Sequence, residues 1–225
     1  MSHDWSVVRR VLPLCLFLVL MGLAKPAAAQ GFSDGFENGA IDPFWSTFQQ
    51  LGTAQLSSEQ SHSGAQSIKL SSSLVGQRTV LLTHTFSQAT KGTLSVWFFD
   101  NSPGTATLYS GLYAYNTVTG DSFAVNVADW NGTHYVWHGP GSGEAPTAVP
   151  RTAGWHELTL RVTDAGFEAL VDQVVVGAIA GDFTFDTVHL LLQGPGSRAA
   201  TFYFDDFSFT PPSLSSPSPV GPGAS

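Results

Sequence analysis

The sequence predicts an all-β protein, built as a two-sheet antiparallel β-sandwich or a related barrel. Three observations support this prediction. Residues 31–210 show no sustained helical periodicity, they contain short alternating or apolar runs, and turn-forming residues separate those runs. About eleven runs at this spacing are typical of a sandwich or barrel, and we find no internal repeat, so one domain is the simplest interpretation.

Each expected strand is a short run with alternating apolar residues, or one rich in β-branched and aromatic residues. In chain order the expected strands are 52–59, 67–73, 78–86, 92–100, 106–116, 121–130, 133–138, 155–163, 167–177, 187–194 and 201–209. Residues that favour tight turns lie between them: "NSPG" at 101–104, "TGD" at 119–121, "NG" at 131–132 and "DAG" at 164–166. Asp172, inside one of these runs, is expected to begin a further tight turn.

The first 29 residues are expected to be a signal peptide. Arg9 and Arg10 precede the apolar stretch "VLPLCLFLVLMGLA", and small residues up to Ala29 suit cleavage there. The apolar stretch is shorter than the ~20 residues that a membrane span needs. We therefore expect a secreted protein, extracellular or periplasmic after cleavage.

The expected sandwich domain spans residues 30–210, and a tail of different composition follows it. Residues 211–225 read "PPSLSSPSPVGPGAS", which is the composition of a disordered tail or linker and contains no apolar membrane anchor.

The charge balance restricts the partners. Removal of the signal peptide leaves six basic and sixteen acidic residues, a formal net charge of −10, and no cysteine. An acidic chain disfavours nucleic acid and anionic membranes as partners. The charge is compatible with a neutral ligand or with a site for cations, and the core must hold the fold without disulfides.

The stretch "TFYFDDFSF" at 201–209 raises an electrostatic problem. Strict alternation along a strand places Asp205 on one face and Asp206 on the other, so one carboxylate would face the core. A buried carboxylate needs a partner or a metal ion. The alternative is that this aspartate accepts hydrogen bonds from backbone N–H groups at a bulge or strand end.

Three blocks of sequence resemble the concanavalin A-like lectins and glucanases, a jelly-roll superfamily that includes LamG-like and glucuronan-lyase-related secreted proteins. The blocks are "SDGFENGAIDPFW" at 33–45, "SHSGAQSIKL" at 61–70, and the set "GWHELTLRV", "EALVDQVVV" and "FYFDDFSF" at 154–162, 168–176 and 202–209. The resemblance implies a jelly roll whose first and last strands share a structural calcium ion. By position, it implies as ligands Glu37, Ser63, Gln66, Asp205 and Asp206. Calcium prefers such oxygen ligands, and Gly35 stands where some relatives have a further aspartate.

Aromatic residues on two expected strands form the candidate ligand-binding surface. Tyr113 and Tyr115 share one face of their strand, and Tyr135 and Trp137 share one face of another. If these strands are neighbours, the four rings form a platform on which sugar rings can stack. The alternative is that these rings belong to the core.

An enzymatic function is the competing hypothesis. The E-x-D-x-x-E strand of the glucanases, which pairs two carboxylates for glycoside hydrolysis, does not occur. A polysaccharide lyase would need a base and a cation for the uronate, and the candidate residues are Arg78, Tyr113, Tyr115, His134 and Tyr135. His134 and His138 lie ~13 Å apart if they are on a strand, which excludes a shared zinc ion.

From these patterns we expect a monomeric, secreted, carbohydrate-binding, lectin-like jelly roll with a structural calcium site. A polysaccharide lyase or another glycan-active enzyme on the same fold is the first alternative. A surface or matrix module that binds protein partners is the second.

Overall fold

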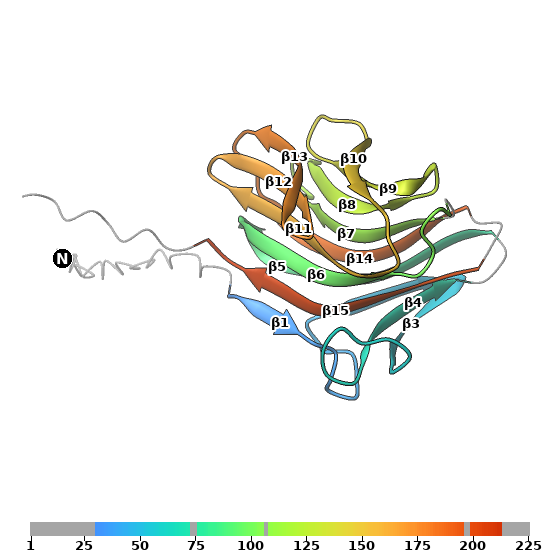
Figure 1. Cartoon of the computed structure of the whole chain (residues 1–225). Coiled ribbons are helices and arrows are strands. Elements are labelled where there is room, and N and C mark those ends of the chain that lie inside the picture. Colours follow the sequence, from blue (N-terminus) through green and yellow to red (C-terminus); the bar gives the residue numbers. More distant parts are fainter. Residues whose placement is uncertain (1–29, 73–75, 106–107, 196–198, 213–225) are drawn as a thin grey trace, which may run out of the picture.

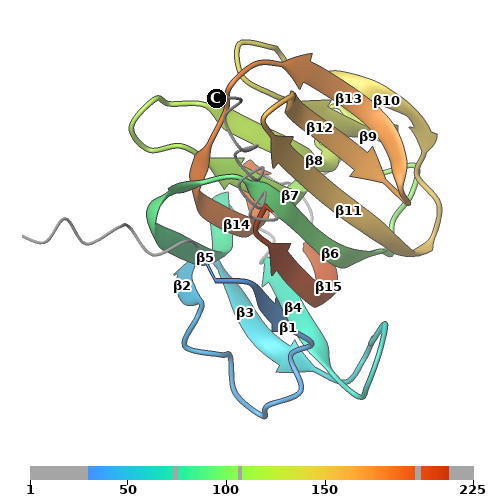
Figure 2. The same cartoon turned by 90° about the vertical axis from the view of Figure 1, so that its left-hand side faces the viewer.

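The structure is a computed structural model that describes residues 30–72, 76–105, 108–195 and 199–212. These residues form fifteen strands and no helix, arranged as two stacked sheets whose strands are bent along their length (Figures 1 and 2). All strand pairings are antiparallel. The predicted β-sandwich is therefore confirmed. The expected signal peptide, residues 1–29, lies outside the described residues, as do residues 213–225 of the expected tail.

We call the two layers sheet A and sheet B. Sheet A contains, in spatial order, β13 (Val174–Ala180), β12 (Gly166–Val171), β11 (Gly154–Thr163), β6 (Gly92–Asp100), β15 (Ala200–Thr210), β4 (Ser67–Ser72) and β3 (Gly52–Ser57), and β1 (Phe32–Asp34) also pairs with β15. Sheet B contains β10 (Ala145–Pro150), β9 (Asn131–His138), β8 (Ser122–Ala128), β7 (Tyr109–Tyr115), β14 (Phe185–Pro195), β5 (Gln77–Thr90) and β2 (Ser46–Gln50).

Several elements differ from the predicted runs. The strands β2 and β10 were not expected, because neither contains an alternating apolar pattern; β2 is exposed along its whole length. The predicted run 167–177 is a hairpin, β12 and β13, joined at Asp172 and Gln173. Both turn residues have positive φ, 48° and 65°, as the hairpin turns that match strand twist require. The tight turn expected at Asp172 is thus present.

The core lies between the inner faces of the two sheets. Alternate residues of each central strand point into it, such as Leu94, Val96 and Phe98 of β6 against Leu190 and Leu192 of β14. Burial of these apolar side chains stabilises the sandwich, at about 25 cal/mol per Å² of apolar surface removed from water. The described residues contain no cysteine, so no disulfide contributes to this core.

The closing strand β15 resolves the electrostatic problem by a β-bulge. Phe202 and Phe204 pack into the core, and so do Phe207 and Phe209. In an uninterrupted strand the even-numbered and the odd-numbered residues would lie on opposite faces. The phase changes at Asp206, whose φ is +46°, where the pairing with β6 shifts register. The prediction that one of the two carboxylates faces the core is therefore wrong, because the bulge adds one residue and keeps both out of it.

Candidate functional site

The outer face of sheet B carries an aromatic and histidine-rich surface. Tyr113, Ala124 and Leu191 are buried in a cluster separate from the core, with Leu81 and Tyr115 packed against them. These residues lie on β5, β14, β7 and β8, which are neighbours in sheet B. We call this surface the outer face of sheet B.

Two histidines extend this surface on either side of β7. His189 of β14 lies beside Tyr115, with ring centroids 5.1 Å apart, and its Nδ1 is 2.7 Å from Thr83 Oγ1. His138 of β9 lies 6.0 Å from Tyr113 between ring centroids. Burial lowers the pKa of His189 to about 4 and also lowers the pKa of His138, so both rings are neutral near pH 7.

Two polar atoms of the outer face are buried and have no hydrogen-bond partner among the described residues. They are Asn126 Oδ1 and His138 Nδ1. Asn126 is completely buried on β8, and its Nδ2 donates to Val127 O at 2.9 Å; His138 uses Nε2 with Ser122 Oγ at 3.2 Å. An unsatisfied buried polar atom costs about 1–3 kcal/mol, so these atoms suit water or a ligand.

Acidic residues border one end of the outer face. Glu144 Oε2 accepts a hydrogen bond from Trp130 Nε1 at 2.8 Å and one from Tyr109 Oη at 3.3 Å. Trp130 is 48% exposed at the turn between β8 and β9. Burial raises the pKa of Tyr109 well above its usual range, and the neighbouring carboxylates Glu144 and Asp129 add to the rise.

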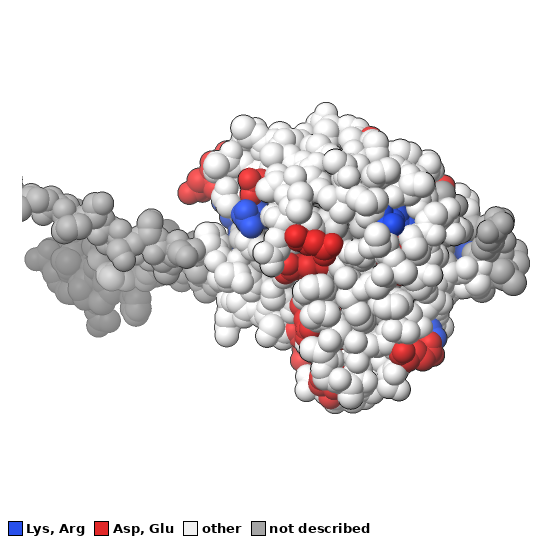
Figure 3. All heavy atoms as spheres, in the orientation of Figure 1, with Lys and Arg blue, Asp and Glu red and all other residues white. Residues whose placement is uncertain are grey.

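The described residues provide no lysine or arginine on the outer face of sheet B. Arg78 is fully buried on the inner face of β5, and Arg151 forms a buried ion pair with Asp100 just after β10. Arg161, Lys69 and Lys91 belong to sheet A or its edge, where each pairs with carboxylates. Few Lys or Arg side chains are visible on the side of the molecule that Figure 3 shows. The described residues thus offer no lysine or arginine at this site for an anionic ligand.

The predicted aromatic platform is only partly assembled. Tyr113 and Tyr115 lie on the outer face, but β8 separates β7 from β9. Tyr135 is completely buried in the core, and Trp137 packs against the core on the same side of β9. The four rings therefore do not form one platform, because Tyr135 and Trp137 occupy the inward phase of β9.

The residue set suggested for a lyase is not brought together either. Arg78 and Tyr135 are both completely buried on inner faces. Tyr113 and Tyr115 lie on the outer face of sheet B, and His134 lies on the side of β9 opposite Tyr135. Arg78 consequently cannot neutralise a uronate carboxylate bound on that face.

The outer face contains functional candidates that the sequence patterns did not single out: Asn126, Glu144 and His189. A usable signal exists for two of them. Asn126 in "AVNVA" and His189 in "TVHLLLQ" are polar residues within apolar runs, which is where an interior-facing or site-facing polar group is expected.

A second feature joins the chain ends, as predicted for the calcium site. Glu37, which follows β1, accepts hydrogen bonds at Oε1 from Ala65 N at 2.8 Å and Gln66 N at 2.7 Å. Glu37 thereby attaches the segment after β1 to the loop between β3 and β4.

The two aspartates of β15 hold the same loop. Asp205 is completely buried, and its Oδ2 accepts from His62 N at 2.8 Å and Ser63 N at 3.2 Å, while Oδ1 accepts from Asp206 N at 2.8 Å. Asp206 accepts from Ser63 Oγ at 2.7 Å and lies 2.6 Å from His62 Nδ1. We call Glu37, Asp205, Asp206 and the loop residues 62–66 the clasp.

The clasp residues differ in how well they fit calcium. Burial raises the pKa of Asp205, and backbone donors occupy both of its oxygens, so the bulge alternative accounts for Asp205 without a metal. Within the described ranges, no group of three or more His, Cys, Asp or Glu side chains is arranged to hold a metal ion. Glu37, Ser63 and Asp206 remain a partly exposed set of oxygen donors of the kind that calcium prefers.

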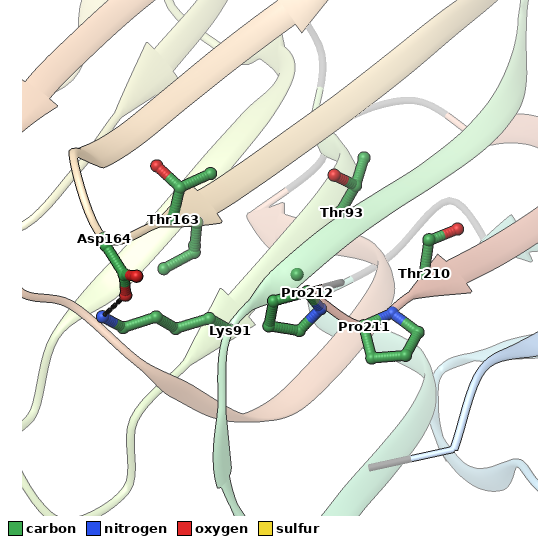
Figure 4. A pocket seen from close by; sticks show the side chains of 9 residues that line it. Lys91, Thr93, Thr163, Asp164, Thr210, Pro211 and Pro212 are labelled. Carbon is green, nitrogen blue, oxygen red and sulfur yellow. Dashed lines mark hydrogen bonds and ion pairs between the residues drawn. The ribbon is translucent and has the colours of Figure 1, made fainter. Parts of the chain in front are cut away.

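A pocket of about 290 Å³ lies elsewhere, at the ends of β6, β11 and β15 (Figure 4). It is lined by Lys91, Gly92, Thr93, Val162, Thr163, Asp164, Thr210, Pro211 and Pro212. Its charged groups already pair, with Lys91 Nζ 2.6 Å from Asp164 Oδ1. We assign no function to it, because it contains neither an unsatisfied polar group nor an exposed aromatic face.

No family model matches the sequence, and no curated protein matches it. The fold is similar to that of solved structures of low sequence identity. The cellulose-induced protein Cip1 has 15% identity and a TM-score of 0.61 over 80% of this chain and 96% of its own. The laminarinase catalytic domain from Thermotoga maritima has 13% identity and a TM-score of 0.60, over 79% and 96% of the two chains. The endo-β-1,4-glucuronan lyase from Trichoderma reesei has 12% identity and a TM-score of 0.53, over 82% and 96%.

These similarities confirm the predicted two-sheet jelly-roll fold. Among the described residues there is no helix long and apolar enough to cross a membrane.

Proposed function

We propose that this protein is a secreted glycan-binding jelly roll that binds its ligand on the outer face of sheet B. Solved structures with this fold include glucanases, a glucuronan lyase and a cellulose-induced protein, which supports a glycan as the ligand class. The proposal includes removal of residues 1–29 as a signal peptide, on the composition of that segment.

One observation carries the proposal: buried, unpartnered polar atoms lie beside aromatic rings on one face. Asn126 Oδ1 and His138 Nδ1 can hydrogen-bond sugar hydroxyls, and the rings of Tyr113 and Tyr115 can contact the apolar faces of sugar rings. Ligand sites in proteins commonly combine an apolar lining with a few oriented polar groups.

Binding without catalysis is the preferred form of this function. Glycoside hydrolysis needs two carboxylates flanking the scissile bond. The carboxylates nearest the rings are Glu144, beside Tyr109, and Asp186, beside Thr187 across from Tyr115, so they lie at opposite ends of β7 and do not flank one bond. The described residues also place no cation there to neutralise a uronate.

As part of the same proposal, calcium binds at the clasp through Glu37, Ser63 and Asp206. The oxygen chemistry of this set supports the proposal. So does the local balance of groups that can carry charge, because three carboxylates, those of Glu37, Asp205 and Asp206, lie beside one histidine, His62. When bound, calcium would supply charge compensation and stability to the clasp, away from the sugar surface.

The test is isothermal titration with a panel of soluble oligosaccharides, together with assays for product. We compare the protein with Tyr115→Ala, and with Trp155→Ala, which removes a partly exposed ring from sheet A. The expected result is binding that Tyr115→Ala weakens about tenfold and Trp155→Ala leaves unchanged.

Release of reducing ends without growth of ultraviolet absorbance would show that the protein is a glycoside hydrolase. Release accompanied by the absorbance of an unsaturated uronate would show a lyase. An equal loss of affinity in both variants would overturn the placement of the site. Absence of binding to every oligosaccharide would favour the protein-partner alternative.

A further inference from the structure

Carboxylates lie at both ends of the outer face of sheet B, and at the Tyr115 end Asp186 Oδ1 accepts a hydrogen bond from Thr187 Oγ1 at 2.9 Å. At its Tyr109 end, Glu144 and Asp129 lie beside the hydroxyl of Tyr109. The described residues give this end no lysine or arginine. We call Tyr109, Asp129, Trp130 and Glu144 the acidic end.

The charge of Glu144 extends over the central part of the face. Burial lowers the pKa of His138, and the Glu144 carboxylate opposes this fall. Burial raises the pKa of Tyr113, and Glu144 is among the neighbours that raise it further. Glu144 is therefore within electrostatic range of both residues that flank the proposed sugar surface.

A second, independent observation points to a ligand at this place. Asn126 of β8 pairs directly with Gly111 of β7. Gly111 is two residues along β7 from Tyr109. The Oδ1 atom of Asn126 is completely buried without a partner. Asn126 Oδ1 is a hydrogen-bond acceptor without a donor among the described residues, and the carboxylates of Glu144 and Asp129 attract a cation.

An ammonium group satisfies these requirements together. It has three N–H donors, no acceptor, and a positive charge that two carboxylates attract. The ring of Trp130 is 48% exposed beside Glu144, and a cation over an indole face gains about 0.5–1 kcal/mol at exposed sites. A polyuronate would meet only repulsion here.

We propose that the outer face of sheet B binds a polysaccharide with free amino groups, such as a polymer of glucosamine, with an ammonium group held at the acidic end. This inference rests on the proposed glycan-binding function and names its ligand class. It involves no covalent step.

The test is titration of the protein with three hexasaccharides of glucosamine, N-acetylglucosamine and glucose. The measurements are made at about pH 6, where amines of this kind are protonated, in low and in high salt. The glucosamine hexamer is expected to bind most tightly, by about fivefold or more, and to lose that advantage in high salt.

Matched variants locate the preference. Glu144→Gln is expected to remove the advantage of the glucosamine hexamer over the glucose hexamer. Glu157→Gln makes the same chemical change on β11 of sheet A and should retain the advantage.

The outcomes separate this inference from the function on which it rests. Equal affinity for the glucosamine and glucose hexamers would overturn the inference and leave glycan binding intact. A glucosamine preference that persists in Glu144→Gln, or disappears equally in Glu157→Gln, would also overturn it by showing non-specific attraction to an acidic protein. Failure of all three hexamers to bind would count against both proposals.

Discussion

Arg151 shows how a single side chain joins the two sheets. Its Nε donates to Asp100 Oδ2 at 2.7 Å and its Nη2 donates to Asp100 Oδ1 at 2.9 Å, with both side chains almost completely buried. The remaining donors reach Thr105 O at 2.8 Å and Ser102 O at 3.0 Å. Arg151 follows β10 in sheet B, and Asp100 ends β6 in sheet A, so the pair connects the layers.

Removal of one partner is predicted to be costly. Asp100→Ala leaves the guanidinium buried without its counter-charge and should lower the free energy of unfolding by about 3–5 kcal/mol in urea denaturation. The control is Glu168→Ala, which breaks the Arg161–Glu168 pair, whose side chains are 38–41% exposed. A loss below ~1 kcal/mol is expected there, and similar losses in the two variants would contradict this argument.

His189 gives a pH dependence that can be assigned to one residue. Burial lowers its pKa from 6.5 to about 4, so the native state favours the neutral ring. The stability linked to His189 is complete above pH 6.5 and is lost as the pH falls toward about 4. The size of the effect is on the order of 3 kcal/mol.

The measurement is the unfolding free energy of the protein and of His189→Gln across this pH range. Titration of the carboxyl groups occurs in both proteins and cancels in the difference. The variant should have a shallower acid slope than the unmodified protein. Parallel curves for the protein and His189→Gln would exclude His189 as the source.

At the scale of elements, Trp137 of β9 and Gly177 of β13 set how closely these two strands approach (Figure 2). A Cβ atom at Gly177 would lie 2.1 Å from the indole ring of Trp137, which is too close for any real contact. The ring therefore lies flat over the glycine backbone, where it closes this end of the sandwich.

A methyl group at position 177 is predicted to separate these two strands. Gly177→Ala should destabilise the protein by about 1–3 kcal/mol, because it overpacks a site that Trp137 fills. Gly143→Ala is the matched control, since nothing lies within 4 Å of its added Cβ. It should change stability by less than about 0.5 kcal/mol in the same melting experiment. An equal effect at both positions would contradict the packing argument.

The same strands show what the sequence could and could not predict. Alternation located most strands and the fold, because the central strands have clear inward residues such as Leu94, Val96 and Phe98. Alternation does not say which face of a strand points to the core when both faces carry aromatic and polar side chains. In β9 the aromatic phase, Tyr135 and Trp137, faces the core.

The candidate site was harder to predict for a physical reason. The turns predicted at 119–121 and 131–132 imply that β8 lies between β7 and β9, but they do not say which face of β9 points to the core. The sequence also cannot show that a bulge at Asp206 changes the phase of β15, because the bulge depends on pairing with the distant strand β6. Tyr113 and Tyr115 were identified correctly as outer-face residues only because their strand alternates without interruption.

At the scale of the whole molecule, the clasp connects segments far apart in the sequence. The strand β1 pairs with β15, and carboxylates that follow β1 or lie in β15 hold the loop between β3 and β4 (Figure 1). The ring of His62 in this loop also stacks on Trp97 of β6, with centroids 3.7 Å apart. The clasp thus fixes both ends of the domain to sheet A.

If calcium binds there, its removal should weaken this connection throughout the molecule. A ligand that binds only the native state at 100 times its Kd adds about 2.7 kcal/mol, and a domain of this size changes Tm by about 2–4 °C per kcal/mol. Chelation is therefore expected to lower Tm by roughly 5–10 °C, and added calcium should restore it. Glu37→Gln should melt at the same temperature with and without calcium, whereas Glu157→Gln on the opposite side of β6 from β15 should retain the calcium response. A Tm that does not respond to chelation in the unmodified protein would show that His62, Ser63 and the backbone N–H groups suffice to hold the carboxylates, and the clasp would then close without a metal.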